Sequence, residues 1–147
     1  MNNIFKVSVI IPVYNAAEFL QQGLDSLLSQ TLRDIEIICV NDGSSDKSLE
    51  ILKEYEKKDS RIKVIDQENQ GAGAARNNGM AIAQGEYLAF LDADDFFEEN
   101  MLEEAYNAAR AKDAEVCVFN ADLYDYTEKT YKKCTWAFRK QYFPERE

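Results

Sequence analysis

The sequence predicts an α/β fold: a doubly wound, mostly parallel sheet flanked by helices. Short apolar runs rich in β-branched and aromatic residues alternate along the chain with segments of helical periodicity. Nearly continuous apolar runs are typical of strands that helices cover on both faces. The resulting β-α-β-α-β-α-β-α-β order favours parallel strands joined by right-handed crossovers. In such folds ligands bind beyond the carboxyl ends of the strands, so the residues that follow each strand are the candidate site.

Each element has its own signal in the sequence. The strands are predicted from apolar runs at 7–13, 35–40, 62–65, 87–91 and 116–119. The first helix is predicted from leucines at i, i+4, i+7 and i+8 in 20–28, and the second from Leu49, Leu52 and Tyr55, which follow a capping segment at 42–46. The third is predicted from an alanine-rich stretch at 72–83. The fourth is predicted at 98–112, which begins with acidic and ends with basic residues, as the helix dipole favours. An irregular hairpin is expected from 124–131 and 133–138.

Composition bounds the function. The 147 residues are 46% hydrophobic and 12% aromatic, which suits one folded domain, since domains most often have roughly 100–150 residues. A net charge of −10 without a basic stretch makes a nucleic-acid partner improbable. An acidic protein that binds a nucleotide diphosphate needs a local positive group, such as a divalent cation, an arginine or a helix N-terminus.

Histidine is absent and the three cysteines are widely spaced, which excludes Ser-His-Asp and Cys-His catalysis within the chain and makes zinc improbable. Cys39 and Cys117 lie in apolar runs, where cysteine usually acts as a small core residue. The first residues of this sequence are not expected to act as a signal peptide, because they lack a long hydrophobic region, and no apolar run approaches 18 residues. The sequence therefore favours a cytoplasmic protein, with any membrane contact made through other parts of a longer protein.

Asp92-Ala93-Asp94-Asp95 is the most informative segment, because it places three carboxylates directly after the fourth predicted strand. Their mutual repulsion would be relieved by a hard divalent cation with oxygen ligands, Mn²⁺ or Mg²⁺. In an extended Asp-x-Asp the two outer side chains would point the same way, one to a metal and one to a ribose hydroxyl. An acidic loop that only caps the next helix is the alternative.

Weaker signals follow the other strands. Asp42 follows the second run and would face the cleft, although an Asp-Gly-Ser turn is common. Pro12 marks the end of the first strand, and Tyr14 after it could stack on a nucleobase. Arg76 is the one cation in a Gly- and Ala-rich segment and suits a base carbonyl or a phosphate. Glu18 is expected in the first turn of the first helix, where a dipole role is the more common one.

Taken together, these segments resemble family 2 of the glycosyltransferases, which has a GT-A, Rossmann-like fold. The resemblance implies transfer of a sugar, with inversion, from a nucleoside-diphosphate donor (commonly a UDP-sugar) to a glycan or lipid-linked acceptor, as in surface polysaccharide or glycan synthesis. The metal would stabilise the departing diphosphate. The matching segments are 7–15, 29–31, 37–46, 69–79 and 85–95.

The resemblance also implies roles for individual residues. The base-binding edge corresponds to the end of the first strand, with Asp42 hydrogen-bonding the base and Arg76 assisting. Asp92 corresponds to the ribose side of the Asp-x-Asp motif. The expected substrate contacts are Pro12, Val13, Tyr14, Glu18, Asp42, Arg76, Asp92 and Ala93, and the expected metal ligand is Asp94.

Residues 1–120 then correspond to the nucleotide-sugar-binding half, and 121–147 to the incomplete start of an acceptor-side region. Family members supply a general base well beyond the Asp-x-Asp motif, and Asp122 and Asp125 come too soon to match it. The general base is therefore expected beyond residue 147, so the chain is expected to bind donor with weak or no transfer activity.

Three other classes of protein are alternative interpretations of the sequence. Sugar nucleotidyltransferases share this architecture, but they carry a Gly-rich basic loop after the first strand, where this chain has 14–18 without a basic residue. A receiver-like domain would place its acidic pair after the first strand and another aspartate after the third, which does not match. A non-catalytic nucleotide-binding or interaction module is the third alternative.

Overall fold

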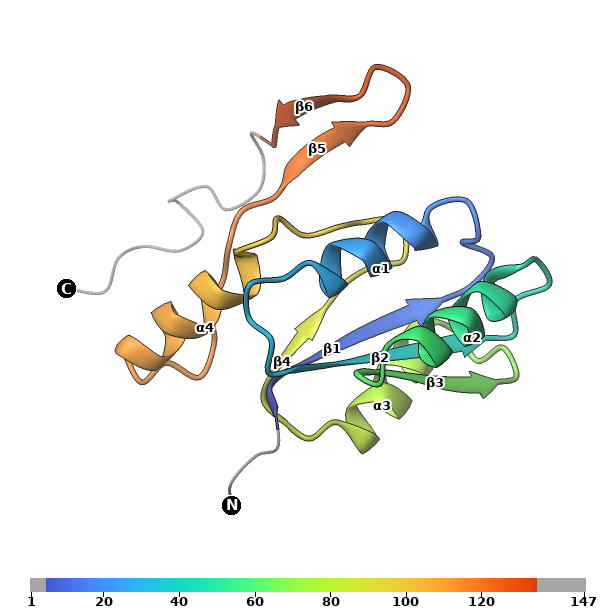
Figure 1. Cartoon of the computed structure of the whole chain (residues 1–147), viewed down its shortest axis with the longest axis horizontal. Helices are drawn as coiled ribbons and strands as arrows, with labels where there is room; N and C mark the ends of the chain where they lie inside the picture. Colours follow the sequence, from blue (N-terminus) through green and yellow to red (C-terminus); the bar gives the residue numbers. More distant parts are fainter. Residues whose placement is uncertain (1–4, 135–147) are drawn as a thin grey trace.

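The computed structural model describes residues 5–134, and through α4 its elements alternate as the sequence predicts. Hairpin β5–β6 follows α4 (Figure 1). The elements are β1 (Phe5–Val13), α1 (Leu20–Leu28), β2 (Ile35–Asp42), α2 (Ser48–Lys58), β3 (Ile62–Gln67), α3 (Ala72–Ile82), β4 (Gly85–Phe90), α4 (Met101–Ala111), β5 (Asp122–Asp125) and β6 (Thr130–Lys133).

The main sheet has four parallel strands in the order β3-β2-β1-β4. Val13 at the end of β1 is level with Asn41 of β2, and Asn41 is level with Asp66 of β3. The carboxyl ends of these three strands therefore form one edge. This arrangement confirms the predicted α/β class with a parallel sheet flanked by helices.

Helices cover both faces of the sheet. Alternate residues of β1, from Val7 to Val13, pack with α1, α2 and Leu102 of α4 in one core cluster. Ile10 of β1 faces the other way and packs with Ala75 of α3 in a second, smaller cluster. In Figure 1, α1 and α3 lie on opposite sides of the sheet. Because β2 is buried along its whole length, its apolar residues at 37–40 follow one another without alternation.

The predicted fifth strand at 116–119 is wrong. This segment has no strand partner among residues 5–134, and Val116 and Val118 are 74% and 55% exposed. The hydroxyl of Tyr87 in β4 donates to the carbonyl of Ala114 just before it, so the segment passes near the sheet without joining it. β4 is consequently an edge strand in the part of the chain that the structure describes. The predicted hairpin is wrong in its bounds: β5 and β6 pair 122–125 with 130–133, so the predicted first arm at 124–131 contains the turn. Residues 135–138 of the predicted second arm lie outside the described residues.

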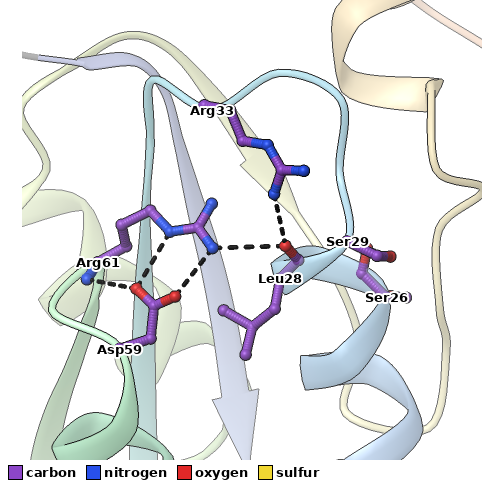
Figure 2. A network of polar contacts seen from close by, with 6 residues as sticks. All are labelled: Ser26, Leu28, Ser29, Arg33, Asp59 and Arg61. Atoms are coloured by element: carbon purple, nitrogen blue, oxygen red, sulfur yellow. Dashed lines mark hydrogen bonds and ion pairs between the residues drawn. The ribbon is translucent and has the colours of Figure 1, made fainter.

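Polar contacts tie the elements together at the edge opposite the candidate site. Arg61 forms a two-point ion pair with Asp59, and its guanidinium also donates to the carbonyl of Leu28 at the end of α1 (Figure 2). Arg33 donates to the same carbonyl at 3.1 Å. Cationic donors at a helix C-terminus satisfy carbonyls that have no partner within the helix.

A buried glutamate joins three strands at the same edge. Glu36 of β2 accepts hydrogen bonds from Ser8 of β1, from Lys63 of β3 and from the N–H of Gln84 before β4. Burial alone would raise the pKa of Glu36, but these hydrogen bonds and the charge of Lys63 lower it below its ordinary value. Glu36 is therefore a structural charge at the edge away from the candidate site.

No helix within residues 5–134 is both long and apolar enough to cross a membrane.

Candidate functional site

The loops that follow β1 and β2 are joined through Asn15. This residue has a left-handed backbone (φ 49°), which asparagine tolerates better than most residues. Its side-chain oxygen accepts from the N–H groups of Ser45 and Asp46, and its own N–H donates to Ser44 Oγ at 3.0 Å. Asp46 in turn accepts from the N–H of Ala17. Asn15 therefore links two loops of the ligand edge.

The predicted base-binding edge is only partly accessible. Tyr14 is 56% exposed beyond the end of β1, Pro12 is partly buried, and Val13 is fully buried, so the Val13 side chain has no surface to offer a ligand. Glu18 is exposed in the turn before α1, which begins at Leu20, so its predicted place in the first helical turn is wrong. Residues 14–19 instead form the loop that is hydrogen-bonded to the segment after β2, and α1 begins only after this loop.

Asp42 is buried at the end of β2 and is already hydrogen-bonded by its own chain. Its Oδ1 accepts from Gln67 Nε2 and from the N–H of Gln70, and its Oδ2 accepts from the N–H of Gly71, each at 2.8 Å. Burial acts to raise the pKa of Asp42, but these three donors lower it below its ordinary value. The carboxylate is thus ionised and holds the entry to α3.

Gly43 allows this close approach. It has φ +72°, and a Cβ at this position would lie 2.8 Å from the backbone nitrogen of Asn69. A larger residue would therefore push the 69–71 loop away from Asp42.

The acidic segment forms a turn rather than an extended strand end. β4 ends at Phe90, and the N–H of Asp95 donates to the carbonyl of Asp92 at 3.0 Å. The expected parallel direction of the Asp92 and Asp94 side chains, which required an extended backbone, is therefore wrong. Burial and the neighbouring charges of Asp94 and Asp92 raise the pKa of Asp95, so negative charge accumulates in this turn.

Arg76 pairs with Asp92. Its guanidinium lies 2.6 Å from Asp92 Oδ1, and the Asp92 side chain stays 57% exposed. The arginine comes from the first half of α3 and the aspartate follows β4, so two segments that the sequence marked separately meet here. The family resemblance implied that Arg76 assists Asp42 at the nucleobase. Among the described residues, however, Arg76 forms its ion pair with Asp92 of the acidic turn and none with Asp42.

A cleft of about 770 Å³ lies over the acidic turn. Its polar side contains Arg76, Asp92, Asp94 and Asp95, and its other side comes from 96–101, 119–124 and the tyrosines of the hairpin. Tyr14, Glu18 and Asp42 do not line this cleft. The structure therefore joins Arg76 to the Asp-x-Asp motif and leaves the end of β1 and Asp42 as a separate part of the same sheet edge.

The residues present suit a divalent cation bound together with a ligand. No group of three or more His, Cys, Asp or Glu side chains within residues 5–134 is arranged to hold a metal by itself. Mg²⁺ is commonly held by one or two carboxylates plus substrate phosphates, and the acidic turn supplies oxygen donors of that kind. Asp94 lines the cleft and Asp92 lies beside it, so both fit a site completed by a diphosphate.

Two neighbouring residues that sequence reasoning missed, Gln30 and Thr31, hold the segment after the acidic turn. Gln30 is fully buried, and its amide donates to the carbonyl of Glu98 at 2.7 Å and accepts from the N–H of Leu102 at 3.0 Å. The backbone N–H of Thr31 donates to the carbonyl of Glu99. The signal was present, because 29–31 was one of the segments that carried the family resemblance, but the partners lie some 70 residues away.

Sequence reasoning also missed the tyrosines of the hairpin. The hydroxyl of Tyr126 donates to the carbonyl of Asp94 at 2.7 Å. Tyr124 and Tyr131 line the same cleft. Their only sequence signal was a clustering of tyrosines in 124–131.

Comparison with known proteins places this geometry in a family. The family model for glycosyl transferase family 2 matches residues 8–147. The chain is similar to the glycosyltransferase GlyG of Streptococcus pneumoniae, with 40% identity over 126 residues, which is 85% of this chain and 42% of that protein. The chain thus spans less than half the length of this relative.

Two solved structures are similar in fold. S. aureus TarS (residues 1–349, in complex with UDP) has a TM-score of 0.68 and 32% identity over 73% of this chain and 32% of that one. The mannosyltransferase PcManGT from Pyrobaculum calidifontis, in complex with GDP-Man and Mn²⁺, has a TM-score of 0.59 and 25% identity over 63% of this chain and 28% of that one. The fold is GT-A, and the chain belongs to glycosyl transferase family 2.

Proposed function

We propose that this chain is the donor-binding part of a metal-dependent, inverting glycosyltransferase that uses a nucleoside-diphosphate sugar, with UDP as the nucleotide. The observation that carries the proposal is the cleft beyond the carboxyl end of β4, where Arg76, Asp92 and Asp94 gather. A cation and carboxylates at this edge suit a metal-bound diphosphate. The similar TarS structure contains UDP, and the similar PcManGT structure contains GDP-Man and Mn²⁺, which supports this ligand class.

Each residue has a defined part in the proposal. Asp94 would hold Mn²⁺ or Mg²⁺, and Asp92 beside it would face the ribose. When bound, the cation supplies charge neutralisation to the diphosphate that leaves the sugar. Arg76 fixes Asp92 and contributes positive charge at the same point. Ala93 brings the backbone of the turn to the ribose.

The nucleobase would bind at the end of β1. Tyr14 is exposed there and stacks on the base, flanked by the backbone of Pro12 and Val13. A carboxylate has about four acceptor positions, and three of those on Asp42 are occupied, which leaves one for a base N–H. Glu18, in the exposed turn before α1, contributes at the rim of this site.

Donor binding rather than sugar transfer is the activity we propose for the isolated chain. Inverting transfer needs a general base on the face of the sugar opposite the leaving group. We assign none to the described residues, because Asp122, which lines the cleft, and Asp125 come too soon after the Asp-x-Asp motif to match the general base of the family. We further propose a glycan or lipid-linked acceptor, bound with the help of other parts of a longer protein that works in the cytoplasm or at the membrane surface.

The test is a calorimetric titration of the chain with UDP, with Mn²⁺ and with a chelator. We expect binding that needs the metal and that falls at least about tenfold in Asp94→Ala, because a lost metal ligand weakens the whole complex. Glu54→Ala is the matched control: it removes the same charge from an exposed position of α2 and should bind as the wild type does.

Equal UDP affinity with metal and with chelator would contradict the metal role. Absence of UDP binding in a folded chain under both conditions would contradict donor binding itself.

A further inference from the structure

The hairpin β5–β6 brings aromatic rings to the cleft instead of to a hydrophobic core. Tyr124 and Tyr131 are opposite each other in the register of the two strands, and their ring centroids are 5.0 Å apart. Cross-strand partners lie on the same face of a hairpin. Both residues line the cleft, and Tyr131 is 57% exposed, so its ring is available to a ligand.

A further ring extends this surface to the acidic turn. Phe96, which directly follows the turn, packs edge-on against Tyr124 with centroids 5.2 Å apart and an interplanar angle of 88°. The centroids of Phe96 and Tyr131 are 6.4 Å apart. These contacts form one aromatic cluster, made of Phe96, Tyr124 and Tyr131, within the lining of a single cleft.

Tyr126 fixes this cluster relative to the carboxylates. Its hydroxyl donates to the backbone carbonyl of Asp94 at 2.7 Å, and its ring lies 5.1 Å from Phe19, which directly precedes α1. Tyr126 also packs edge-on against Tyr124 at 5.0 Å. The hairpin is thereby held over the acidic turn, and a ligand at Asp94 lies beside the aromatic cluster.

Aromatic rings and carboxylates therefore lie together in the lining of one cleft. A pyranose has matching parts: C–H groups on its faces can pack on an aromatic ring, and hydroxyl groups around its rim donate hydrogen bonds to carboxylates. We propose that the aromatic cluster is a subsite for a pyranose ring, with Tyr131 as its stacking surface and the acidic turn as the acceptor of sugar hydroxyls. The inference deepens the proposed function and rests on it for the source of the sugar.

The test uses methyl β-D-glucopyranoside, without nucleotide, and saturation-transfer NMR on the whole chain. Tyr131→Leu removes the ring but keeps apolar volume, and Tyr131→Phe keeps the ring but removes the hydroxyl. We expect transfer to the ring protons of the glycoside in the wild type and in Tyr131→Phe, and affinity at least about fivefold weaker in Tyr131→Leu. Amide spectra of each variant show whether the fold is kept.

Three results would overturn the subsite: no transfer to the glycoside in the folded wild type, equal affinity in Tyr131→Leu, or an equal loss in Tyr131→Phe. Because this arm contains no nucleotide, it separates the two proposals. Glycoside binding without UDP binding would contradict donor binding and keep the subsite, and the reverse result would contradict the subsite alone.

A second arm distinguishes the donor sugar from the acceptor sugar. The glycoside is measured again with saturating UDP and Mn²⁺, and then with UDP-glucose and Mn²⁺. Displacement of the glycoside by UDP-glucose but not by UDP supports a donor-sugar subsite. Simultaneous binding with UDP-glucose supports an acceptor subsite.

Discussion

Replacing Asp42 with asparagine tests whether this carboxylate is a structural anchor of the ligand edge. Asp42 is 2% exposed and accepts three hydrogen bonds from the 67–71 segment. In the best orientation of Asp42→Asn, the amide oxygen keeps Gln67 and Gln70 as donors. The amide NH₂ then faces the N–H of Gly71, so one charge-assisted hydrogen bond is lost and two buried donors oppose each other.

The expected cost follows from those contacts. A hydrogen bond to a charged group contributes about 1.5–3 kcal/mol, and a buried donor left without an acceptor costs about 1–3 kcal/mol. Because the two effects overlap at one site, we expect the free energy of unfolding to fall by about 2–4 kcal/mol at pH 7.

The loss should also depend on pH. The pKa of Asp42 is lowered in the folded chain, so its stabilisation is complete above the unfolded pKa of about 3.9 and is lost as the pH falls through the folded value. Asparagine does not titrate. The difference in stability between wild type and Asp42→Asn should therefore be constant from pH 7 to about pH 5 and shrink below about pH 4.

Urea unfolding followed by circular dichroism, repeated from pH 7 to pH 3, measures this difference. Other carboxyl groups with lowered pKa values, such as Glu36 and Asp59, are present in both proteins and cancel when the two are subtracted. A loss below about 1 kcal/mol at pH 7, or a difference that does not change with pH, would refute the anchoring role.

Three other outcomes follow from local contacts. Gly79→Ala should lower the free energy of unfolding by about 1–3 kcal/mol, because the new Cβ would lie 2.6 Å from a core side chain. Gly73→Ala in the same helix is the control: its Cβ would meet nothing within 4 Å, so the free energy of unfolding should rise by about 0.5–1 kcal/mol. Equal shifts of the melting temperature in the two variants would contradict this difference. Gln30→Ala should cost about 1–3 kcal/mol and speed amide exchange in 97–102, and unchanged exchange would exclude its anchoring role. Burial raises the pKa of Cys39 to about 12, so a thiol reagent at pH 8 should modify it only on unfolding; labelling of the native chain at the unfolded rate would contradict this.

The sequence was sufficient for the elements whose pattern is set by burial. β1 and β2 are covered on both faces, so each contains a continuous apolar run (9–13 in β1, 37–40 in β2) and is readily identified. The stripe of Leu20, Leu24 and Leu27 likewise marks the face of α1 that packs on the sheet.

The same reasoning fails where the outcome depends on a partner. Residues 116–119 have the composition of a strand, but a strand also needs a neighbour with free backbone groups, and none pairs with it among the described residues. The turn at Asp92–Asp95 was likewise invisible, because a short acidic run is compatible with both extended and turned backbones.

The sequence was sufficient to predict which charged residues belong to the candidate site, but it did not predict which residues these side chains contact. The sequence marked Arg76 and Asp92 separately, and the structure shows that they pair. The links made by Asn15 and Gln30 join residues that are far apart in the chain, and no local pattern encodes such partners. The same holds for the hydroxyl of Tyr126 on Asp94.

The strand order has a consequence for how the chain acquires its structure during synthesis. β1 is made first but lies in the interior of the sheet, between β2 and β4. The pairing of β1 with β2, and of β2 with β3, requires only residues up to Gln67, whereas Phe5 of β1 can pair only after Gly85 has been made. Pairings between residues so distant in sequence form slowly, because a long loop must close first. A nascent chain should therefore pass through a three-stranded stage in which one side of β1 is still open to chaperones.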